Sequence, residues 1–235
     1  MELQEIMTFL KEKGSEQTRK IYKNHGSPEN FYGVKVSDLK TIQKKVKKKH
    51  DLAIQLFATG NGDAMYLAGL ISEPKKMTKK ELQNWADTSS WYMISEYAVA
   101  WTVAESDFAL ELGIEWINGD SNHLKCIGYA TLGSYIAITQ DEDLEIDFYK
   151  QEVEKIAKII HSSENRVRYT MNGFVIAVGA YIQELYPLAK EVGEKIGKVD
   201  VSLGKTACKV PVIKPYLENI ETRGRLGKKR KTAKC

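Results

Sequence analysis

An aromatic ring and a carboxylate are spaced in this chain so that both could contact one ligand. Tyr92 follows Ser89 and Ser90, and Glu96 comes four residues after Tyr92. A serine before a helix can accept hydrogen bonds from the free amides of the first turn, and helical residues four apart share one face. The spacing therefore predicts a capped helix start that presents Tyr92 and Glu96 together. The alternatives are a core position for Tyr92 and a solvent-exposed one for Glu96.

Metal-dependent chemistry has no support in the spacing of the usual ligands. The three cysteines, Cys126, Cys208 and Cys235, are far apart in the sequence, and the four histidines are equally scattered. Neither a C-x-x-C pair nor an H-E-x-x-H motif occurs, and either would bring ligands to metal-binding distance. We therefore expect no metal and no cofactor. The cysteine pattern also favours a reducing compartment.

A second candidate motif imitates a phosphate-binding loop without completing it. Gly204, Lys205 and Thr206 match the end of the G-x-x-x-x-G-K-[ST] pattern, but its first glycine would fall on Val199. The G-x-G-x-x-G and G-x-S-x-G motifs are absent as well. Nucleotide hydrolysis, Rossmann-type cofactor chemistry and serine hydrolysis are therefore not expected.

The elements that position these residues are predicted to be helices throughout. Apolar residues recur at offsets of three and four along almost the whole chain, and the alternation typical of strands is nearly absent. The clearest helical stripe comprises Val167, Met171, Phe174, Val178 and Tyr181. Turn residues divide the chain into about ten or eleven helices with short connections. We therefore predict an all-α fold of stacked antiparallel helix pairs, forming a curved, HEAT-like solenoid. An irregular helical bundle is the alternative.

Positive charge is concentrated at the C-terminal end of the chain. The formal net charge is +4, but residues 223–235 hold seven Lys or Arg and no acid, which leaves −3 for the rest. We expect a single helical-repeat domain over residues 1–222 and a basic tail over 223–235. Within the tail, Lys228, Lys229 and Arg230 could neutralise DNA phosphates. A disordered, solubilising tail is the alternative.

The chain is not expected to enter a membrane. Its longest weakly polar runs, residues 127–138 and 174–182, are shorter than a bilayer span requires, and residues 1–13 are charged and amphipathic. We expect a cytoplasmic location and no membrane partner.

Several segments, taken in order, carry a resemblance to a known family. They are residues 22–25 followed by 31–34 and Leu39, residues 90–92 with Glu96, Ser162 and Ser163 leading to Gly173 and Phe174, and residues 207–211 ahead of the GKKRK tail. Together they resemble the DNA alkylation repair family, the HEAT-like-repeat DNA glycosylases of the AlkD type. The resemblance implies a solenoid whose basic concave face holds double-stranded DNA, in a bacterial-type protein associated with the nucleoid when bound. It also implies excision of cationic N3- or N7-alkylated purines without base flipping. The resemblance implies a monomer as well, and no sustained heptad seam argues otherwise.

The resemblance also assigns roles to individual residues. The family's aspartate falls on Glu96, its two lesion-flanking tryptophans fall on Tyr92 and Phe174, and its phosphate-holding arginine falls on Cys126. An alkylated purine is a cationic leaving group, so a nearby carboxylate can stabilise the sugar cation and orient a water molecule. Glu96 is thus the expected catalytic residue. The expected DNA and lesion contacts are Tyr92, Trp91, Phe174, Cys126, Lys125, Arg166 and Arg168.

The departures from the family pattern leave three functions open. A cysteine cannot make the forked phosphate contacts of an arginine, although Lys125, Arg166 or Arg168 could supply a cation from a neighbouring position. The first function is a DNA glycosylase. The second is a member of the family that binds DNA but does not cleave the glycosidic bond, and the third is a helical-repeat scaffold that binds another protein.

Overall fold

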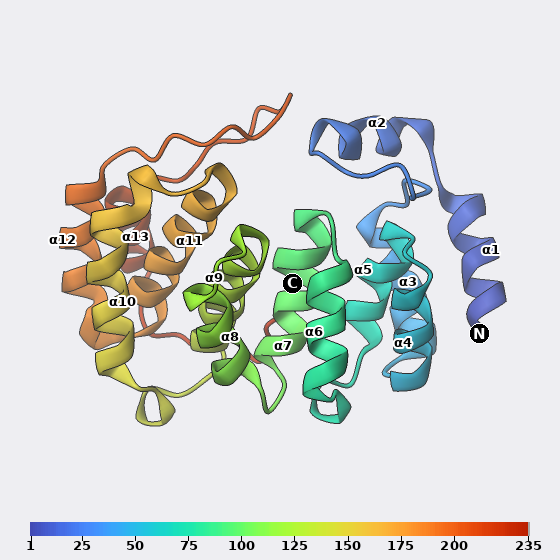
Figure 1. Ribbon diagram of the computed structural model, residues 1–235, viewed down its shortest axis with the longest axis horizontal. Helices are drawn as coiled ribbons and strands as arrows, with labels where there is room; N and C mark the ends of the chain where they lie inside the picture. The colour runs from blue at the N-terminus through green and yellow to red at the C-terminus, as the bar shows by residue number, and fades with distance from the viewer. Residues whose placement is uncertain (235) are drawn as a thin grey trace. The chain divides into compact units, whose positions relative to one another are not determined.

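A computed structural model describes residues 1–234 as helices joined mostly by short connections (Figure 1). Thirteen α-helices and no strand occur among these residues, which confirms the all-α prediction with more helices than the turn pattern indicates. Contacts between Cα atoms divide the chain into two compact units. Unit 1 comprises residues 1–108, 203–207 and 234, and unit 2 comprises residues 109–202 and 208–233. The expectation of one domain over residues 1–222 stays a prediction.

Unit 1 is built around α5, because every residue of that helix is buried. α5 packs against α3, α4 and a π-helix named η2, and a Cβ placed on Gly69 would lie 2.9 Å from Ala98 Cα of η2. Only a glycine at position 69 permits this approach. The elements are α1 (Leu3–Lys13), α2 (Glu16–Asn24), α3 (Val36–Val46), α4 (His50–Ala58), α5 (Gly62–Ile71), η1 (Pro74–Lys76), α6 (Lys79–Thr88), η2 (Met93–Val99) and α7 (Ala100–Ala104).

A buried carboxylate anchors the loop between α2 and α3 onto α5. Asp63 is 3% exposed, and its oxygens accept hydrogen bonds from the backbone amides of Tyr32 (2.7 Å), Gly33 (3.1 Å) and Val34 (2.9 Å). Gly33 has a φ of 81°, a conformation that side chains rarely adopt, and an added Cβ would lie 2.8 Å from the Arg19 backbone nitrogen. The loop therefore has one tightly defined path.

Unit 2 consists of α8 (Ala109–Asn118), α9 (Asn122–Ile136), η3 (Asp141–Asp143), α10 (Ile146–Ile159), η4 (Ile160–Ser162), α11 (Asn165–Tyr181), η5 (Gln183–Leu185), α12 (Tyr186–Ile196) and α13 (Ile213–Thr222). Close contacts at two glycines show the relative direction of α8 and α9. Gly113 of α8 lies against Leu132 of α9, whereas Gly128 lies against Ile117. Residue numbers rise along one helix as they fall along the other, so the pair is antiparallel, as predicted for neighbouring helices.

α9 and α11 of unit 2 run parallel to each other. The rings of Tyr129 and Phe174 lie 5.6 Å apart, and a Cβ on Gly133 would lie 3.4 Å from the Ala177 Cβ. Residue numbers rise together along both helices. The N-terminal ends of α9 and α11 therefore lie at the same end of unit 2.

The basic tail is packed onto unit 2 rather than extended as a disordered arm. Lys229 Nζ lies 2.7 Å from the Asp141 carboxylate and donates to the carbonyl of Ile136 at the end of α9, 3.1 Å away. Its side chain is only 9% exposed. The Arg230 amide donates to the Ala137 carbonyl at 2.7 Å. Lys229 is therefore removed from the proposed phosphate contacts, whereas Lys228 is exposed.

The last described residue is buried in unit 1. Lys234 is 8% exposed, and its Nζ donates to Ser72 Oγ at 3.1 Å, just beyond the end of α5. Lys48 Nζ donates to the Ser72 carbonyl at 2.9 Å. Burial, followed by the neighbouring Lys48 ammonium, lowers the pKa of Lys234 to about 7. This lysine therefore belongs to the interior of unit 1 and not to a solvated tail.

Within residues 1–234, we find no helix that combines the length and the apolar character needed to cross a bilayer.

Candidate functional site

The expected Tyr92 and Glu96 pair lies on a π-helix rather than on a capped α-helix. Ser89 does not cap this element, because its hydroxyl donates to the Ala86 carbonyl at 2.9 Å and so closes the end of α6. Tyr92 is the residue before η2, and Glu96 lies in the first turn of η2. Tyr92 is half-buried and Glu96 is 7% exposed. π-Helical turns are rare and occur frequently at functional sites.

The tryptophan beside Tyr92 is part of an aromatic cluster in unit 1. The Trp91 ring is 5% exposed and lies 5.3 Å from the rings of both Tyr22 and Phe31, which stack on each other at 5.1 Å. Tyr22 also donates to the Val34 carbonyl at 2.9 Å. Burial, with a smaller contribution from the Asp63 charge, raises the pKa of Tyr22 to about 12. Trp91 is therefore a buried member of this cluster, and its ring lies 5.8 Å from that of Tyr92.

A histidine that the sequence did not assign to the site contacts both Trp91 and Tyr92. The Trp91 indole N–H donates to the backbone carbonyl of His25 at 2.9 Å. The Tyr92 hydroxyl lies 2.9 Å from His25 Nδ1. Because 67 positions separate His25 from Tyr92, no local pattern in the sequence indicates this contact.

Phe174 lies in the core of unit 2 and is 1% exposed. Its ring packs against Tyr129 at 5.6 Å and Tyr149 at 6.3 Å. A ring enclosed in this way cannot also pack on a deoxyribose. Phe174 is therefore withdrawn from the expected DNA contacts.

Cys126 is likewise a core residue, at 5% exposed, within the hydrophobic cluster of unit 2. A buried thiol at this position cannot hold a phosphate, so Cys126 is also withdrawn from the expected contacts. The site implied by the resemblance thus loses two of its four assigned positions. Tyr92 and Glu96 remain candidates.

The three cations expected near Cys126 are half-buried at one end of unit 2. Lys125 is in the first turns of α9, and Arg166 and Arg168 are in the first turns of α11. Arg166 lies 4.2 Å above the Tyr169 ring, while Arg168 Nε is buried without a hydrogen-bond partner among the described residues. Because α9 and α11 are parallel, the partial positive charges of both N-termini add to these side chains. We call Lys125, Arg166 and Arg168 the cationic end of unit 2.

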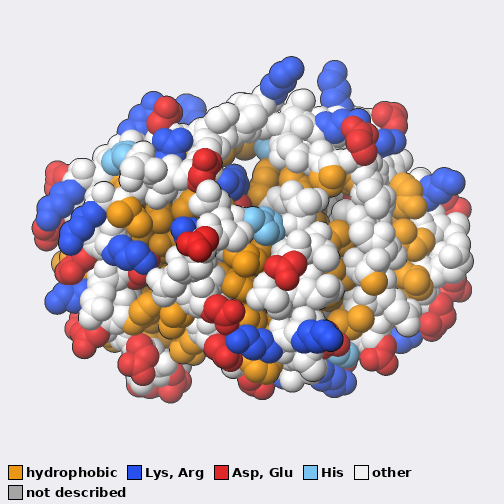
Figure 2. Space-filling view, viewed as in Figure 1, with side chains coloured by type: hydrophobic (Ala, Val, Ile, Leu, Met, Phe, Trp, Pro, Cys, Tyr) orange, Lys and Arg blue, Asp and Glu red, His pale blue; other side chains and the backbone are white. Residues whose placement is uncertain are grey.

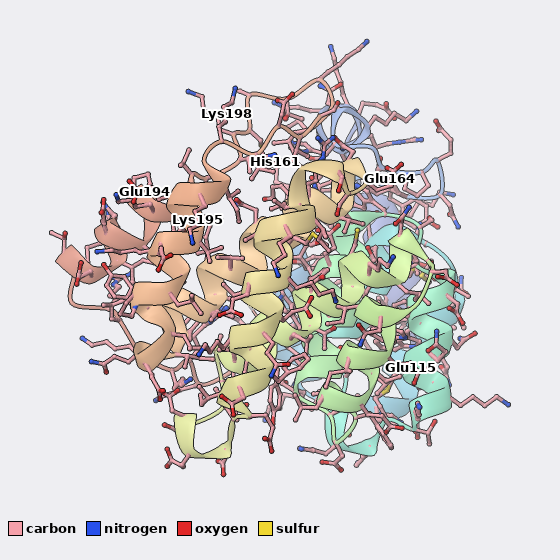
Figure 3. All side chains as sticks on the ribbon, turned by 60° about the vertical axis from the view of Figure 1, so that its left-hand side comes forward. Glu115, His161, Glu164, Glu194, Lys195 and Lys198 are labelled. Atoms are coloured by element: carbon pink, nitrogen blue, oxygen red, sulfur yellow. The ribbon has the colours of Figure 1, made fainter. Side chains whose placement is uncertain are left out.

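Acidic side chains moderate the charge around the cationic end. Basic and acidic side chains are interspersed on the face shown in Figure 2, so the predicted concave basic face stays a prediction. Glu164, labelled in Figure 3, is exposed at the N-cap of α11 and accepts a hydrogen bond from the Asn165 amide at 3.1 Å. The attraction for phosphate therefore depends on the side chains of the cationic end and on both helix termini. Within residues 1–234, no three His, Cys, Asp or Glu side chains are grouped as a metal site.

The sequence of this chain matches a known protein family and two bacterial proteins. The model of a family described as DNA alkylation repair enzyme matches residues 6–187. The chain belongs to this family. An uncharacterized protein of Listeria innocua is 33% identical over 225 residues, covering 93% of this chain and 97% of the relative. A protein of Listeria monocytogenes is 33% identical over 226 residues with the same coverage.

A solved structure also resembles this family member along its whole length. That structure is described as a new family of proteins related to the HEAT-like repeat DNA glycosylases with affinity for branched DNA structures. Its TM-score to this chain is 0.91, its sequence is 32% identical, and the match covers 100% of both chains. The predicted HEAT-like fold and the predicted family are therefore confirmed.

Proposed function

We propose that this protein binds branched DNA and does not hydrolyse the glycosidic bond. The observation that carries the proposal is the burial of Phe174 and Cys126 in the core of unit 2. The resemblance assigned these positions to an aromatic contact at the lesion and to a phosphate clamp. Without them, the site keeps a carboxylate and one aromatic ring but loses the groups that would hold an alkylated nucleotide in place for reaction. The affinity of the structurally similar family for branched DNA supports the same proposal.

The cationic end of unit 2 is the proposed contact with phosphates. Lys125, Arg166 and Arg168 carry three positive charges beside two parallel helix N-termini. Arg168 is half-buried and its Nε is enclosed, so the proposed contact with a phosphate oxygen is through the terminal nitrogens of its guanidinium. A junction brings several phosphate backbones close together, so a compact group of cations neutralises more charge on a junction than on a straight duplex. This difference would favour branched DNA.

Removing one cation from this group is expected to weaken DNA binding and to reduce its dependence on salt. For Arg168→Ala, the slope of log Kd against log salt should fall by about 1, because one phosphate contact is lost. Lys125→Ala should act in the same direction. The measurement is a salt titration of binding to a fluorescent four-way junction. Lys195→Ala is the matched control, because that exposed lysine pairs with Glu191 on α12 at 2.6 Å. An unchanged slope in both variants would remove the cationic end from the interface.

A glycosylase is the second candidate, and the retained carboxylate favours it. Glu96 lies in the turn of η2 that follows Tyr92. A carboxylate beside an alkylated nucleotide could stabilise the cationic sugar as the base departs. Glutamate is one methylene longer than the family's aspartate, however, and an error of about 1 Å in position can cost about a hundredfold in rate.

Release of alkylated bases separates the two candidates. Duplex DNA carrying N7-methylguanine or N3-methyladenine is incubated with the protein, and free base is measured by chromatography. We expect release at the spontaneous rate, and the same rate for Glu96→Gln. Release that is faster than the spontaneous rate and lost in Glu96→Gln would establish the glycosylase instead.

A further inference from the structure

We infer that His25 is a positioning residue that holds Tyr92 in the orientation needed to distinguish branched DNA from straight duplex. The inference rests on the proposed function, because it adds to the charge of the cationic end a second source of discrimination, on the face of unit 1 that carries Tyr92. His25 forms hydrogen bonds with the side chains of both Trp91 and Tyr92.

The two hydrogen bonds come from different parts of His25 and therefore respond differently to substitution. The backbone carbonyl accepts from Trp91 Nε1 at 2.9 Å, and this bond survives any change of side chain. The imidazole Nδ1 lies 2.9 Å from the Tyr92 hydroxyl, and this bond depends on the ring. The rings of His25 and Tyr92 meet at 62° with centroids 6.5 Å apart, so they touch edge to face and not as a stack. The hydrogen bond between the Tyr92 hydroxyl and His25 Nδ1 is thus the directional contact between these two side chains.

The backbone of His25 is itself held in place. His25 is the C-cap of α2, where its amide donates to the Tyr22 carbonyl at 2.9 Å. Gly26 follows with a φ of 77° and turns the chain sharply. Tyr22 is fixed in turn by stacking on Phe31 and by its bond to the Val34 carbonyl. The imidazole therefore occupies a defined position relative to η2.

Holding the phenol before DNA arrives lowers the cost of binding. The Tyr92 ring also packs against Trp91 at 5.8 Å and Tyr97 at 6.5 Å, and His25 adds a fixed partner for its hydroxyl. A tyrosine that is less firmly held must be ordered when a nucleotide packs on it, and ordering one such side chain lowers affinity by about 3- to 10-fold. A straight duplex, whose bases remain stacked, offers little aromatic or sugar surface to Tyr92. Preorganisation of Tyr92 should therefore benefit the junction more than the duplex.

Side-chain variants of His25 and Tyr92 test this role. His25→Leu removes the imidazole at similar size, and Tyr92→Phe removes the hydroxyl. Each is expected to weaken binding to a four-way junction by about 3- to 10-fold, with a smaller change for duplex. The double variant should be no weaker than either single one, because both changes remove the same bond. His25→Asn is the conservative variant, since its side-chain amide places a polar atom near the position of Nδ1, and it should restore most of the affinity.

A second readout follows the hydrogen bond in the free protein. The chemical shift of the Tyr92 ring carbon that bears the hydroxyl, measured by NMR, should change in His25→Leu and return in His25→Asn. The hydrogen-bonded Trp91 indole N–H resonance should persist in all variants, with at most a small shift, and shows that unit 1 is folded. An unchanged Tyr92 signal in His25→Leu, or junction affinity equal to that of the unmodified protein, would overturn the inference. If the unmodified protein shows no preference for junctions, the proposed function fails, and the NMR comparison alone decides whether His25 positions Tyr92.

Discussion

Replacement of Asp63 by alanine should lower the free energy of unfolding by about 3–5 kcal/mol. The carboxylate is 3% exposed and accepts three backbone hydrogen bonds, from Tyr32, Gly33 and Val34, at 2.7 to 3.1 Å. Alanine leaves all three amide donors in a buried position without an acceptor, and each unsatisfied donor costs about 1–3 kcal/mol before relaxation. Water can reach part of the loop in the variant, so the total loss of unfolding free energy is smaller than three times the largest cost per donor. Urea unfolding followed by circular dichroism measures the change.

Two comparisons make the Asp63 result specific. Asp63→Asn keeps one acceptor oxygen and should lose about half as much stability as Asp63→Ala. Asp51→Ala removes an exposed acid in the first turn of α4 and should cost less than about 1 kcal/mol. Equal stability of Asp63→Ala and Asp51→Ala would contradict the anchoring role. Because the anchored loop carries Phe31 of the aromatic cluster, Asp63→Ala should also disturb Trp91 fluorescence.

Replacement of Phe174 by alanine is expected to cost about 3–5 kcal/mol of stability without a specific loss of DNA binding. The ring is 1% exposed and packs against Tyr129 and Tyr149, so its removal leaves a cavity in unit 2. Thermal unfolding gives the loss of stability. Junction affinity is measured at a temperature where both proteins are folded, and it should be unchanged.

The conservative change separates packing from recognition at the same position. Phe174→Leu fills more of the cavity and should cost roughly half as much stability as Phe174→Ala. If Phe174 were instead a DNA contact, both variants would weaken junction binding while leaving unfolding almost unchanged. That outcome would return Phe174 to the site and would weaken the case against a glycosylase.

The spacing of apolar residues along α11 matches its buried face, whereas the resemblance assigned Phe174 of that face to a DNA contact. The stripe of Val167, Met171, Phe174 and Val178 is buried in the structure, as its offsets of three and four require. The same stripe indicates that Phe174 points inward. Matching this position to a family tryptophan placed it at the DNA surface, whereas the structure buries it with the other apolar residues of the stripe.

Other features depend on contacts that no local pattern contains. A π-helix at Met93–Val99 stands where a capped α-helix was expected, and the Ser89 hydroxyl bonds back to Ala86 instead of capping it. The composition of the basic tail is typical of a solvated segment. Lys229 nevertheless donates a hydrogen bond to the Ile136 carbonyl, 93 residues away in the sequence. Such pairings follow from the packing of distant elements, which composition and periodicity do not specify.

The most direct test of the proposed function compares one protein with two DNA molecules. The dissociation constant is measured for a four-way junction and for a straight duplex that contains the same arm sequences, at the same salt concentration. We expect tighter binding to the junction, with the difference reduced in Arg168→Ala. Equal or tighter binding to the straight duplex would contradict it.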